Sequence, residues 1–348
     1  MKLIGISQID IKELERFVLS FNEVTLFQHP SFRNVIEKTK NYEWYWVGVE
    51  HDGTIIGSLA AYDIIDTVAG GMISTRRRMV LGGPLIRVHD EKIRNECMAM
   101  LLDGIRRIGK KPYFIEFRNL FDMSNYDKIF KSKGYKFEEH LNFIIDVTVG
   151  EEELLKRLSS DGRRMVKRAL NKGLIVSEVT NLSEIDTFYN ILLRTYACKG
   201  LPIPDKSLFI SCFTELKDNE RRFLVAKNEQ EQIVAGRLLL IAGPNMYDWY
   251  AAADSKFLDR RPNELLVWSA LRLAIRLGLK TFDFGGAGRP DEKYGVREFK
   301  KKFGGRLVNF GRYNLMVKPV RTAIAKKGMK IIAKMKNRRL MRDCCEPV

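Results

Sequence analysis

The sequence predicts an α/β protein (α+β in its segregation of elements) with two tandem domains, each a mixed, twisted sheet flanked by helices. Two observations predict this class. The 348 residues suffice for two domains of about 150 residues each. One order of expected strands and helices also occurs twice along the chain. Hydrophobic residues make up 45% of the chain, which is enough to form two ordinary cores.

Each half contains an expected β-hairpin. Residues 44–65 alternate between apolar and polar side chains on both sides of Asp52-Gly53, a dipeptide typical of tight hairpin turns. Residues 221–243 repeat the pattern of strand, polar turn and strand. A further strand is expected after each hairpin, over 77–86 in the first half and 246–253 in the second.

An amphipathic helix is expected next in each half, over 91–109 and 263–278. Apolar residues recur there at i, i+3 and i+4, which is the spacing of one helix face. A short strand follows each helix, over 112–119 and 280–288. The two halves therefore continue to match element by element.

Both halves close with a basic amphipathic segment and a last strand, over 126–146 and 296–317. The complete order resembles that of the GNAT acyltransferase fold, so we expect two GNAT-like domains. We place the N-terminal domain over 1–150 and the C-terminal, catalytic domain over 151–315. A basic amphipathic tail is expected over 316–348.

The charge is strongly positive: 60 Lys and Arg stand against 43 Asp and Glu, a net +17. Such an excess favours anionic partners, namely RNA, phosphorylated substrates or an anionic membrane surface. Residues 316–342 carry much of it; they either lie on a membrane, bind RNA or pack on the body. No run reaches the roughly 18 apolar residues of a spanning helix, and no secretory signal is present. We therefore expect a cytoplasmic protein, with peripheral contact to the inner membrane surface through the tail as an option.

Metal, disulfide and covalent-nucleophile chemistry are not expected. The five cysteines and four histidines are scattered, without the spacing of a zinc site or a disulfide framework. We expect no bound metal and no bound cofactor.

Four stretches resemble the Fem family of aminoacyl transferases, which build peptidoglycan bridges. They are 27–32 (FQHPSF), 163–173 (RRMVKRALNKG), 260–271 (RRPNELLVWSAL) and 282–305, which holds FDFGGAG and FKKKFGG. The last is the most diagnostic, and the resemblance covers roughly residues 24–315. It implies transfer of an aminoacyl group from aminoacyl-tRNA, acting as a co-substrate, to an amine of a cell-wall precursor peptide.

The resemblance also implies a reaction centre. The match of Phe299-Lys300 to the family's Phe-Lys pair implies Lys300 as its charged group, and Asp283 is the second catalytic candidate. Gly285 and Gly286 follow that aspartate and let a substrate approach the backbone closely, so with Phe299 they are candidate substrate-binding residues. The alternatives are a solvated lysine at 300 and a mere strand end at 283.

This chemistry is consistent with the residues available. An aminoacyl ester is already activated, so an amine can displace the tRNA hydroxyl without a covalent enzyme intermediate. The protein must align the substrates and stabilise developing charge, which a lysine can do without a Ser/His/Asp or Cys/His set. We expect Phe299 and Phe303 to share one helix face and anchor the helix, with Lys300 near the rim of that face and its ammonium pointing into the cleft. Lys301 and Lys302 are expected in solvent.

Further candidates bind the substrates. Tyr247 and Trp249 alternate with Asp248 on an expected strand, so they share a face that either packs in the core or lines a substrate groove. Arg261 and Asn263, at the start of the second amphipathic helix, are also candidate substrate-binding residues.

Four cations form a candidate tRNA-binding face. Arg163, Arg164, Lys167 and Arg168 follow the spacing i, i+1, i+4 and i+5, which gathers them on one side of a helix. Such a face suits a phosphate backbone, and its alternative is an ordinary solvated face.

Two other functions compete. An acyl-CoA-dependent N-acetyltransferase of the same fold would hold pyrophosphate on a glycine-rich loop entering the helix, but residues 260–265 contain no glycine. A non-catalytic RNA- or membrane-binding module is the second alternative, favoured by the charge alone.

Overall fold

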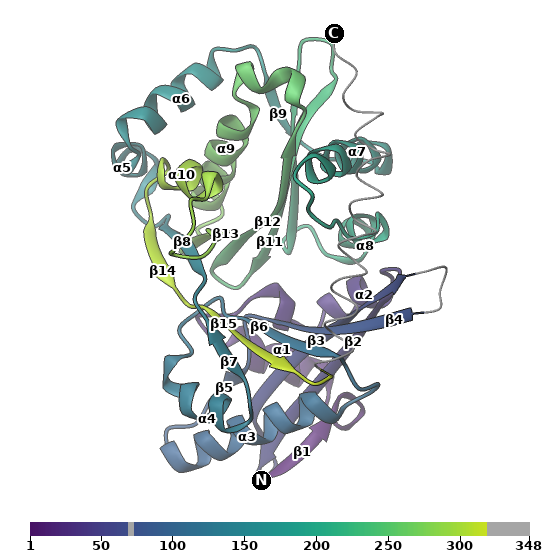
Figure 1. The fold of residues 1–348 in the computed structure, drawn as a ribbon. Coiled ribbons are helices and arrows are strands. Elements are labelled where there is room, and N and C mark those ends of the chain that lie inside the picture. The colour runs from purple at the N-terminus through teal and green to yellow at the C-terminus, as the bar shows by residue number, and fades with distance from the viewer. Residues whose placement is uncertain (69–72, 319–348) are drawn as a thin grey trace. The chain divides into compact units, whose positions relative to one another are not determined.

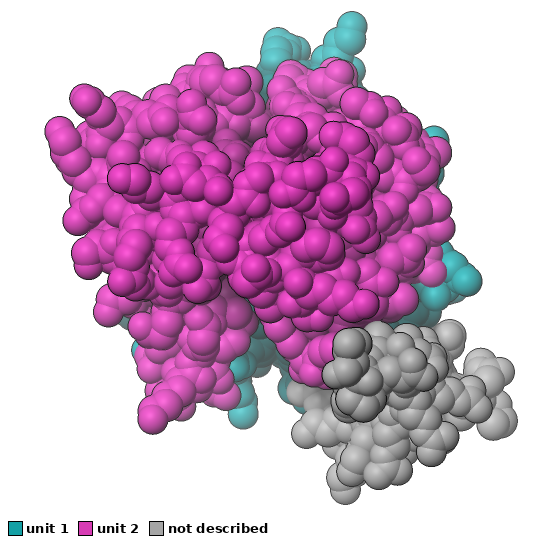
Figure 2. Space-filling model, turned by 90° about the horizontal axis from the view of Figure 1, so that it is seen from above, with its two compact units in different colours: residues 1–140, 309–329 teal, residues 141–308, 330–348 magenta. Residues whose placement is uncertain are grey.

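The computed structural model describes residues 1–68 and 73–318, which form two compact units (Figures 1 and 2). Of the described residues, unit 1 contains 1–68, 73–140 and 309–318, and unit 2 contains 141–308. Most of the expected tail over 316–348, including nearly all of the candidate membrane segment 316–342, lies outside the described residues.

Unit 1 is built on an eight-stranded mixed sheet in the order β1-β2-β3-β4-β6-β15-β7, with β5 paired to β3. The pair β4–β6 is parallel, whereas β1–β2, β2–β3, β3–β4, β3–β5, β6–β15 and β7–β15 are antiparallel. The strands are β1 (Lys2–Gly5), β2 (Tyr42–His51), β3 (Thr54–Val68), β4 (Ile73–Leu81), β5 (Leu85–Ile86), β6 (Phe114–Arg118), β7 (Lys136–Glu138) and β15 (Arg312–Met316). The helices are α1 (Ile11–Leu19), α2 (Phe32–Glu37), α3 (Glu91–Arg107) and α4 (Asp127–Ser132), with 3-10 turns η1 (Ile6–Gln8), η2 (Leu26–Gln28) and η3 (Ser124–Tyr126).

Unit 2 repeats this plan with a seven-stranded sheet in the order β14-β8-β13-β12-β11-β10-β9, in which β12 and β13 are parallel. The strands are β8 (Leu141–Asp146), β9 (Ile175–Glu178), β10 (Arg221–Lys227), β11 (Ile233–Ala242), β12 (Asn245–Ala253), β13 (Thr281–Gly286) and β14 (Arg306–Asn309). The helices are α5 (Gly150–Arg157), α6 (Ser160–Leu170), α7 (Leu182–Cys198), α8 (Ser207–Glu215), α9 (Pro262–Arg276) and α10 (Gly295–Lys301), with η4 (Ser255–Arg260). Figure 1 shows α9 on one face of this sheet and α7 with α8 on the other.

The structure confirms the predicted fold class. Both expected hairpins form, as β2–β3 and β10–β11. Asp52 and Gly53 join the first hairpin with positive φ angles of 49° and 73°, the backbone that a two-residue turn between twisted strands requires. Each hairpin continues into a third strand, a long helix and a parallel strand, as the sequence predicts.

The division between the units differs from the predicted boundary at residue 150. Strand β8, expected in the first domain, lies between β13 and β14 in unit 2, whereas β15, expected in the second domain, lies between β6 and β7 in unit 1. Each sheet thus contains one strand from the other half of the chain. The reason is the backbone pairing of β8 with β13 and of β15 with β6 and β7, which strand periodicity does not encode.

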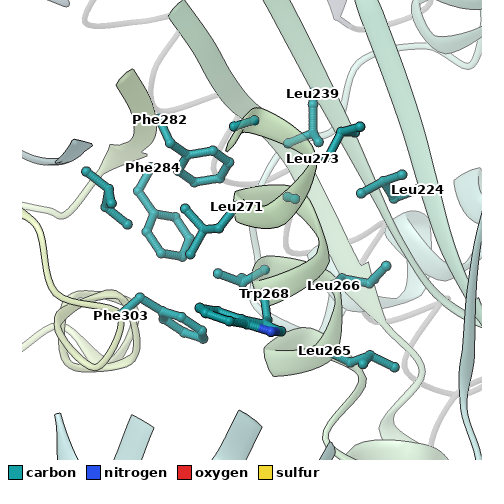
Figure 3. Packing of buried hydrophobic residues seen from close by; sticks show 14 of the residues in the cluster. Leu224, Leu239, Leu265, Leu266, Trp268, Leu271, Leu273, Phe282, Phe284 and Phe303 are labelled. Carbon is teal, nitrogen blue, oxygen red and sulfur yellow. The ribbon is translucent and has the colours of Figure 1, made fainter. Parts of the chain in front are cut away.

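The core of unit 2 joins α9 to the sheet and to the end of α10. Figure 3 shows Trp268 and Leu271 of α9 beside Phe282 and Phe284 of β13, with Phe303 following α10. All five side chains are buried. This packing fixes α10 against the end of β13, where the candidate catalytic residues lie.

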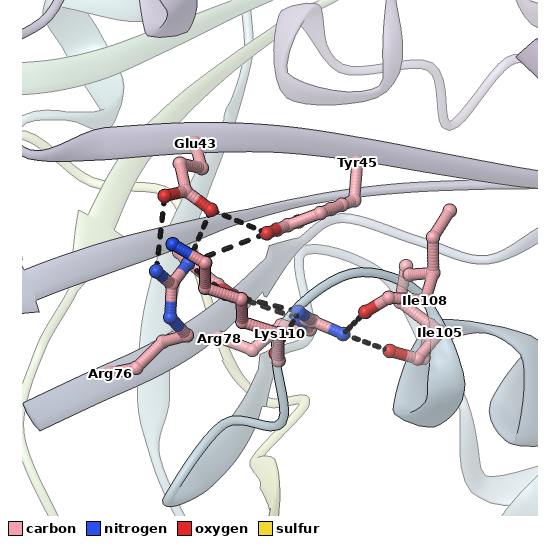
Figure 4. Close-up of polar contacts among 8 residues, drawn as sticks. Glu43, Tyr45, Arg76, Arg78, Ile105, Ile108 and Lys110 are labelled. Atoms are coloured by element: carbon pink, nitrogen blue, oxygen red, sulfur yellow. Dashed lines mark hydrogen bonds and ion pairs between the residues drawn. The ribbon is translucent and has the colours of Figure 1, made fainter.

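Unit 1 holds a buried ionic network besides its apolar core (Figure 4). Arg78 on β4 is fully buried and binds Asp63 on β3 through two bonds of 2.7 and 3.0 Å. Its guanidinium also donates to the carbonyls of Ile108 and Lys110, at 2.9 and 3.1 Å, and so closes the C-terminal end of α3. The buried charge is fully bonded, which is the condition for tolerating it.

Strand β15 joins the sheet of unit 1 from the second half of the chain, and it should be necessary for the stability of this unit. Tyr313 on β15 is buried, and its ring stacks on that of Phe130 at 3.8 Å. Tyr313→Ala should lower the free energy of unfolding of unit 1 by roughly 3 kcal/mol or more, because it leaves a large cavity. Hydrogen exchange should then accelerate in β6 and β7, whereas the exposed Met316→Ala should change little. Accelerated exchange confined to β13 would contradict this assignment of β15.

Candidate active site

Lys300 is buried at the end of strand β13. Its side chain leaves α10, and Nζ donates to the carbonyl oxygens of Phe284 and, at 2.8 Å, of Gly286. The residue is only 9% exposed, so the alternative of a solvated surface lysine is wrong, and the catalytic role of Lys300 stays a prediction. An ammonium has three N–H donors, and these two bonds leave one for a ligand.

The two phenylalanines anchor the helix as predicted. Phe303 is buried and Phe299 half-buried, with ring centroids 5.3 Å apart, and both rings contact Phe284. Of the two lysines expected in solvent, Lys301 is exposed, whereas Lys302 forms an ion pair of 2.8 Å with Asp161.

A glycine bulge shapes the end of β13. Asp283 pairs with Ile144 of β8, but the next pair along the ladder is Gly286 with Asn142, so β13 holds one extra residue. Gly285 absorbs this with a φ of +72°. Its N–H donates to Oδ1 of Asp283 at 2.7 Å, which fixes the carboxylate beside the bulge.

The bare Cα of Gly285 also lets three polar groups converge. A Cβ at this position would lie 3.3 Å from the carbonyl oxygen of Asp248, 3.6 Å from the hydroxyl of Tyr247 and 3.7 Å from Nζ of Lys300. The two predicted residues Tyr247 and Lys300 are therefore brought together here. Gly286 contributes the carbonyl that binds the ammonium.

Trp249 does not continue the predicted alternation. Leu238 of β11 pairs with Tyr250 and Leu239 pairs with Asp248, so Trp249 is the extra residue of a bulge in β12. The rings of Trp249 and Tyr250 contact each other at 5.0 Å. The regular alternation from which a shared face was predicted is therefore interrupted at Trp249, and the shared face of Tyr247 and Trp249 stays a prediction.

Burial shifts the pKa values of both catalytic candidates toward neutrality. Loss of water lowers the pKa of the Lys300 ammonium to about 8, against the attraction of Asp248 and Asp283. Loss of water likewise raises the pKa of the Asp283 carboxyl to about 7, although the N–H of Gly285 and the charge of Lys300 oppose the rise. Such values suit groups that handle protons and charge at neutral pH.

Sequence reasoning missed a buried ion pair next to Lys300. Arg237 on β11 binds Asp248 on β12, with side chains 3% and 7% exposed. Arg237 and Lys300 lie 5.9 and 5.3 Å from the centre of the same Phe284 ring. The available signal was a single arginine inside β11, a strand that is otherwise apolar and buried.

The other substrate-binding candidates lie at the start of α9. Arg261 precedes the helix with a φ of +60°, and its guanidinium lies 3.7 Å from Glu264. Asn263 is half-buried in the first turn. In the described part of the chain, neither residue forms a hydrogen bond or an ion pair with Lys300.

The candidate tRNA-binding cations are all exposed on α6. Arg163 donates to the carbonyls of Leu158 and Lys156, at 2.6 and 2.8 Å, and Arg164 binds Asp161 at 2.6 Å. Lys167 and Arg168 have no ion-pair partner among the described residues. The structure thus places all four on one helix but leaves only two unpaired.

Residues 1–68 and 73–318 contain neither a candidate metal site nor a candidate membrane-spanning helix. No group of three His, Cys, Asp or Glu side chains there could hold a metal ion. No helix in this part of the chain is long and apolar enough to span a membrane.

Comparisons with known proteins agree with this architecture. The model of the acetyltransferase (GNAT) domain matches residues 157–301. The lipid II:glycine glycyltransferase of Staphylococcus aureus is 32% identical over 340 aligned positions, covering 70% of this chain and 80% of that protein. The lipid II:glycine glycyltransferase of Staphylococcus haemolyticus (strain JCSC1435) is 31% identical over 282 positions, covering 75% of this chain and 66% of that protein. The crystal structure of FemX superposes with a TM-score of 0.71 at 18% identity, covering 93% of this chain and all of that one.

The burial of Lys300 should be measurable as a pH dependence of stability. The folded pKa is about 8 and the ordinary value is 10.5, so the unfolded chain binds more protons between these values. Stability should therefore rise with pH from about 8 to about 10.5, and Lys300→Met should lack this rise, which amounts to roughly 3 kcal/mol. Denaturant unfolding at several pH values measures it, with the exposed Lys301→Met as control. Parallel curves for wild type and Lys300→Met would show that the ammonium is not buried.

Proposed function

The chain belongs to the Fem family of acyltransferases, and on this premise we propose that it transfers an aminoacyl group to an amine of a cell-wall precursor peptide. Glycine is the proposed aminoacyl group and lipid II the proposed acceptor, because relatives at 31–32% identity are named lipid II:glycine glycyltransferases. The observation that carries the proposal is the buried Lys300 ammonium beside Asp283 and the Gly285 bulge.

In the proposed reaction the acceptor amine attacks the carbonyl carbon of an aminoacyl ester. A C–N bond forms, and the bond from that carbon to the ribose oxygen breaks. Asp283 accepts the proton that the amine loses, since its pKa of about 7 lies near the working pH. This proton then passes to the leaving ribose oxygen, so the products are an amide and an alcohol.

Lys300 stabilises the charge that develops on the carbonyl oxygen. Two of its N–H bonds hold the ammonium on the backbone, and the third is directed to the reacting oxygen. The hydroxyl of Tyr247 lies beside the same glycine and is the proposed second contact to the substrate. Phe299 acts indirectly, by fixing α10.

Aminoacyl-tRNA is the proposed donor. The exposed cations of α6 suit a phosphate backbone, and the start of α9 holds Arg261, Pro262 and Asn263 rather than a glycine-rich pyrophosphate loop. The second candidate is an acyl-CoA-dependent N-acetyltransferase, which the match of residues 157–301 to the GNAT acetyltransferase domain favours.

A lipid-linked acceptor also requires the protein to work at a membrane surface, so we propose a cytoplasmic protein in peripheral contact with the inner membrane.

Loss of the ammonium should abolish most of the activity. Lys300→Met should lower turnover of glycyl transfer to lipid II by about two to three orders of magnitude, as loss of an oxyanion donor does. Lys301→Met, whose side chain is exposed one position further on, should retain normal turnover. Near-normal turnover of Lys300→Met would show that the lysine has only a structural role.

Charged tRNA should bind through α6 with a strong salt dependence, because phosphate contacts release counterions. Arg163→Ala with Arg164→Ala should weaken binding and flatten the salt slope. Lys167→Ala with Arg168→Ala should do so more strongly, since these two cations give up no ion pair to bind phosphate. Filter binding of glycyl-tRNA at several salt concentrations measures both variants. Saturable binding of acetyl-CoA without affinity for tRNA would instead favour the N-acetyltransferase.

A further inference from the structure

The ion pair of Arg237 and Asp248 is incompletely bonded. Nη1 of Arg237 binds Oδ2 of Asp248, but Nε of the arginine and Oδ1 of the aspartate are buried without a hydrogen-bond partner. Burying two charges is expensive unless hydrogen bonds satisfy the remaining donors and acceptors. This pair therefore meets that condition poorly.

Unit 1 provides the comparison within the same molecule. Arg78 and Asp63 also lie on neighbouring strands, but two bonds join them and backbone carbonyls bind the rest of the guanidinium (Figure 4). That pair has the geometry of a structural ion pair. The Arg237–Asp248 pair makes fewer hydrogen bonds than this structural pair, so stability alone does not readily explain it.

The pair lies next to the buried ammonium of Lys300, because the guanidinium of Arg237 and Nζ of Lys300 lie 5.9 and 5.3 Å from the centre of the same Phe284 ring. A Cβ on Gly285 would lie 3.3 Å from the carbonyl oxygen of Asp248 and 3.7 Å from that Nζ. The charged groups that face Lys300 are Asp248 on β12, Asp283 on β13 and Arg237 on β11; the two carboxylates attract the ammonium and the arginine repels it. On α10 itself, Lys301 is exposed and Arg297 donates to the carbonyl of Ala287 at 2.9 Å. Asp248 therefore has the position of a counter-charge.

The two carboxylates cannot serve Lys300 in the same way. Asp283 loses its negative charge whenever it holds a proton, which is the role proposed for it during the reaction. Asp248 is held against a guanidinium, and Arg237 stays protonated throughout the working range. Asp248 is thus the carboxylate near Lys300 to which the proposed reaction assigns no proton transfer.

We propose that Asp248 is a positioning residue that holds Lys300 in its charged form, and that Arg237 limits the strength of this attraction. The inference rests on the proposed function for its catalytic meaning. Arg237 carries the opposite charge directly beside the carboxylate, so it offsets part of the attraction that Asp248 exerts on the ammonium.

Two variants should shift the titration of Lys300 in opposite directions. Asp248→Asn removes an attracting charge and should lower the pKa of Lys300 by about one unit or more, whereas Arg237→Gln removes a repelling charge and should raise it. NMR of the protein labelled at lysine Cε measures this directly, with Lys300→Met to assign the signal. Glu178→Gln, which removes the carboxylate of an exposed ion pair in the same unit, should leave the titration unchanged.

The rate of glycyl transfer provides the second readout. Its alkaline limb should move to lower pH in Asp248→Asn and to higher pH in Arg237→Gln, a sign reversal that a purely structural role would not produce. If Arg237→Gln fails to fold, Arg237→Lys replaces it; this variant keeps the positive charge and should leave the titration of Lys300 nearly unchanged. Asp248→Asn alone then tests the direction of the pKa shift. An unshifted Lys300 signal in Asp248→Asn, or shifts of the same sign in both variants, would overturn the inference. Opposite NMR shifts with an unmoved rate profile would uphold the electrostatic coupling and refute the proposed function of Lys300.

Discussion

The removal of the Lys300 ammonium from water is the constraint around which the described part of unit 2 is organised. A buried cation needs acceptors, and two carbonyls at the end of β13 supply them. Those carbonyls are available because Gly285 bulges out of the ladder with β8. The helix that delivers the lysine is in turn fixed by the packing of Phe303. Bulge, helix and aromatic core are thus parts of one arrangement.

Such an arrangement is costly for stability and useful for chemistry. Low polarity around Lys300 and Asp283 moves both pKa values toward neutrality, in opposite directions from their ordinary values. The same low polarity strengthens any hydrogen bond that the ammonium makes to a reacting oxygen. Unit 1 has the same plan, but its buried cation Arg78 is fully bonded. Likeness of fold therefore does not extend to the bonding of these two buried cations.

Local patterns in the sequence predicted the local structure well. The Asp52-Gly53 turn, the repeated order of elements and the Phe299–Phe303 anchor all form as expected. Which sheet a strand joins was not predictable, because alternation in residues 141–146 is equally compatible with either neighbour. The burial of Lys300 was not predictable either. Helix periodicity gives the direction of a side chain, but it does not show whether neighbouring elements cover that side chain. The ion pair of Arg237 was signalled only by a single arginine in an otherwise apolar strand, which does not identify its partner Asp248.

Strand β8 links the unpredicted sheet partner to the unpredicted burial of Lys300. Its residues Ile144 and Asn142 pair with Asp283 and Gly286, on the two sides of the bulge. This pairing sets the register of β13 and places the extra residue at Gly285. Gly285 has a positive φ, which a glycine adopts readily. A catalytic domain cut at residue 151 would lack this partner, and β13 would lose the register that places the two carbonyls under Lys300. The site is therefore a property of a sheet completed from outside the predicted catalytic domain.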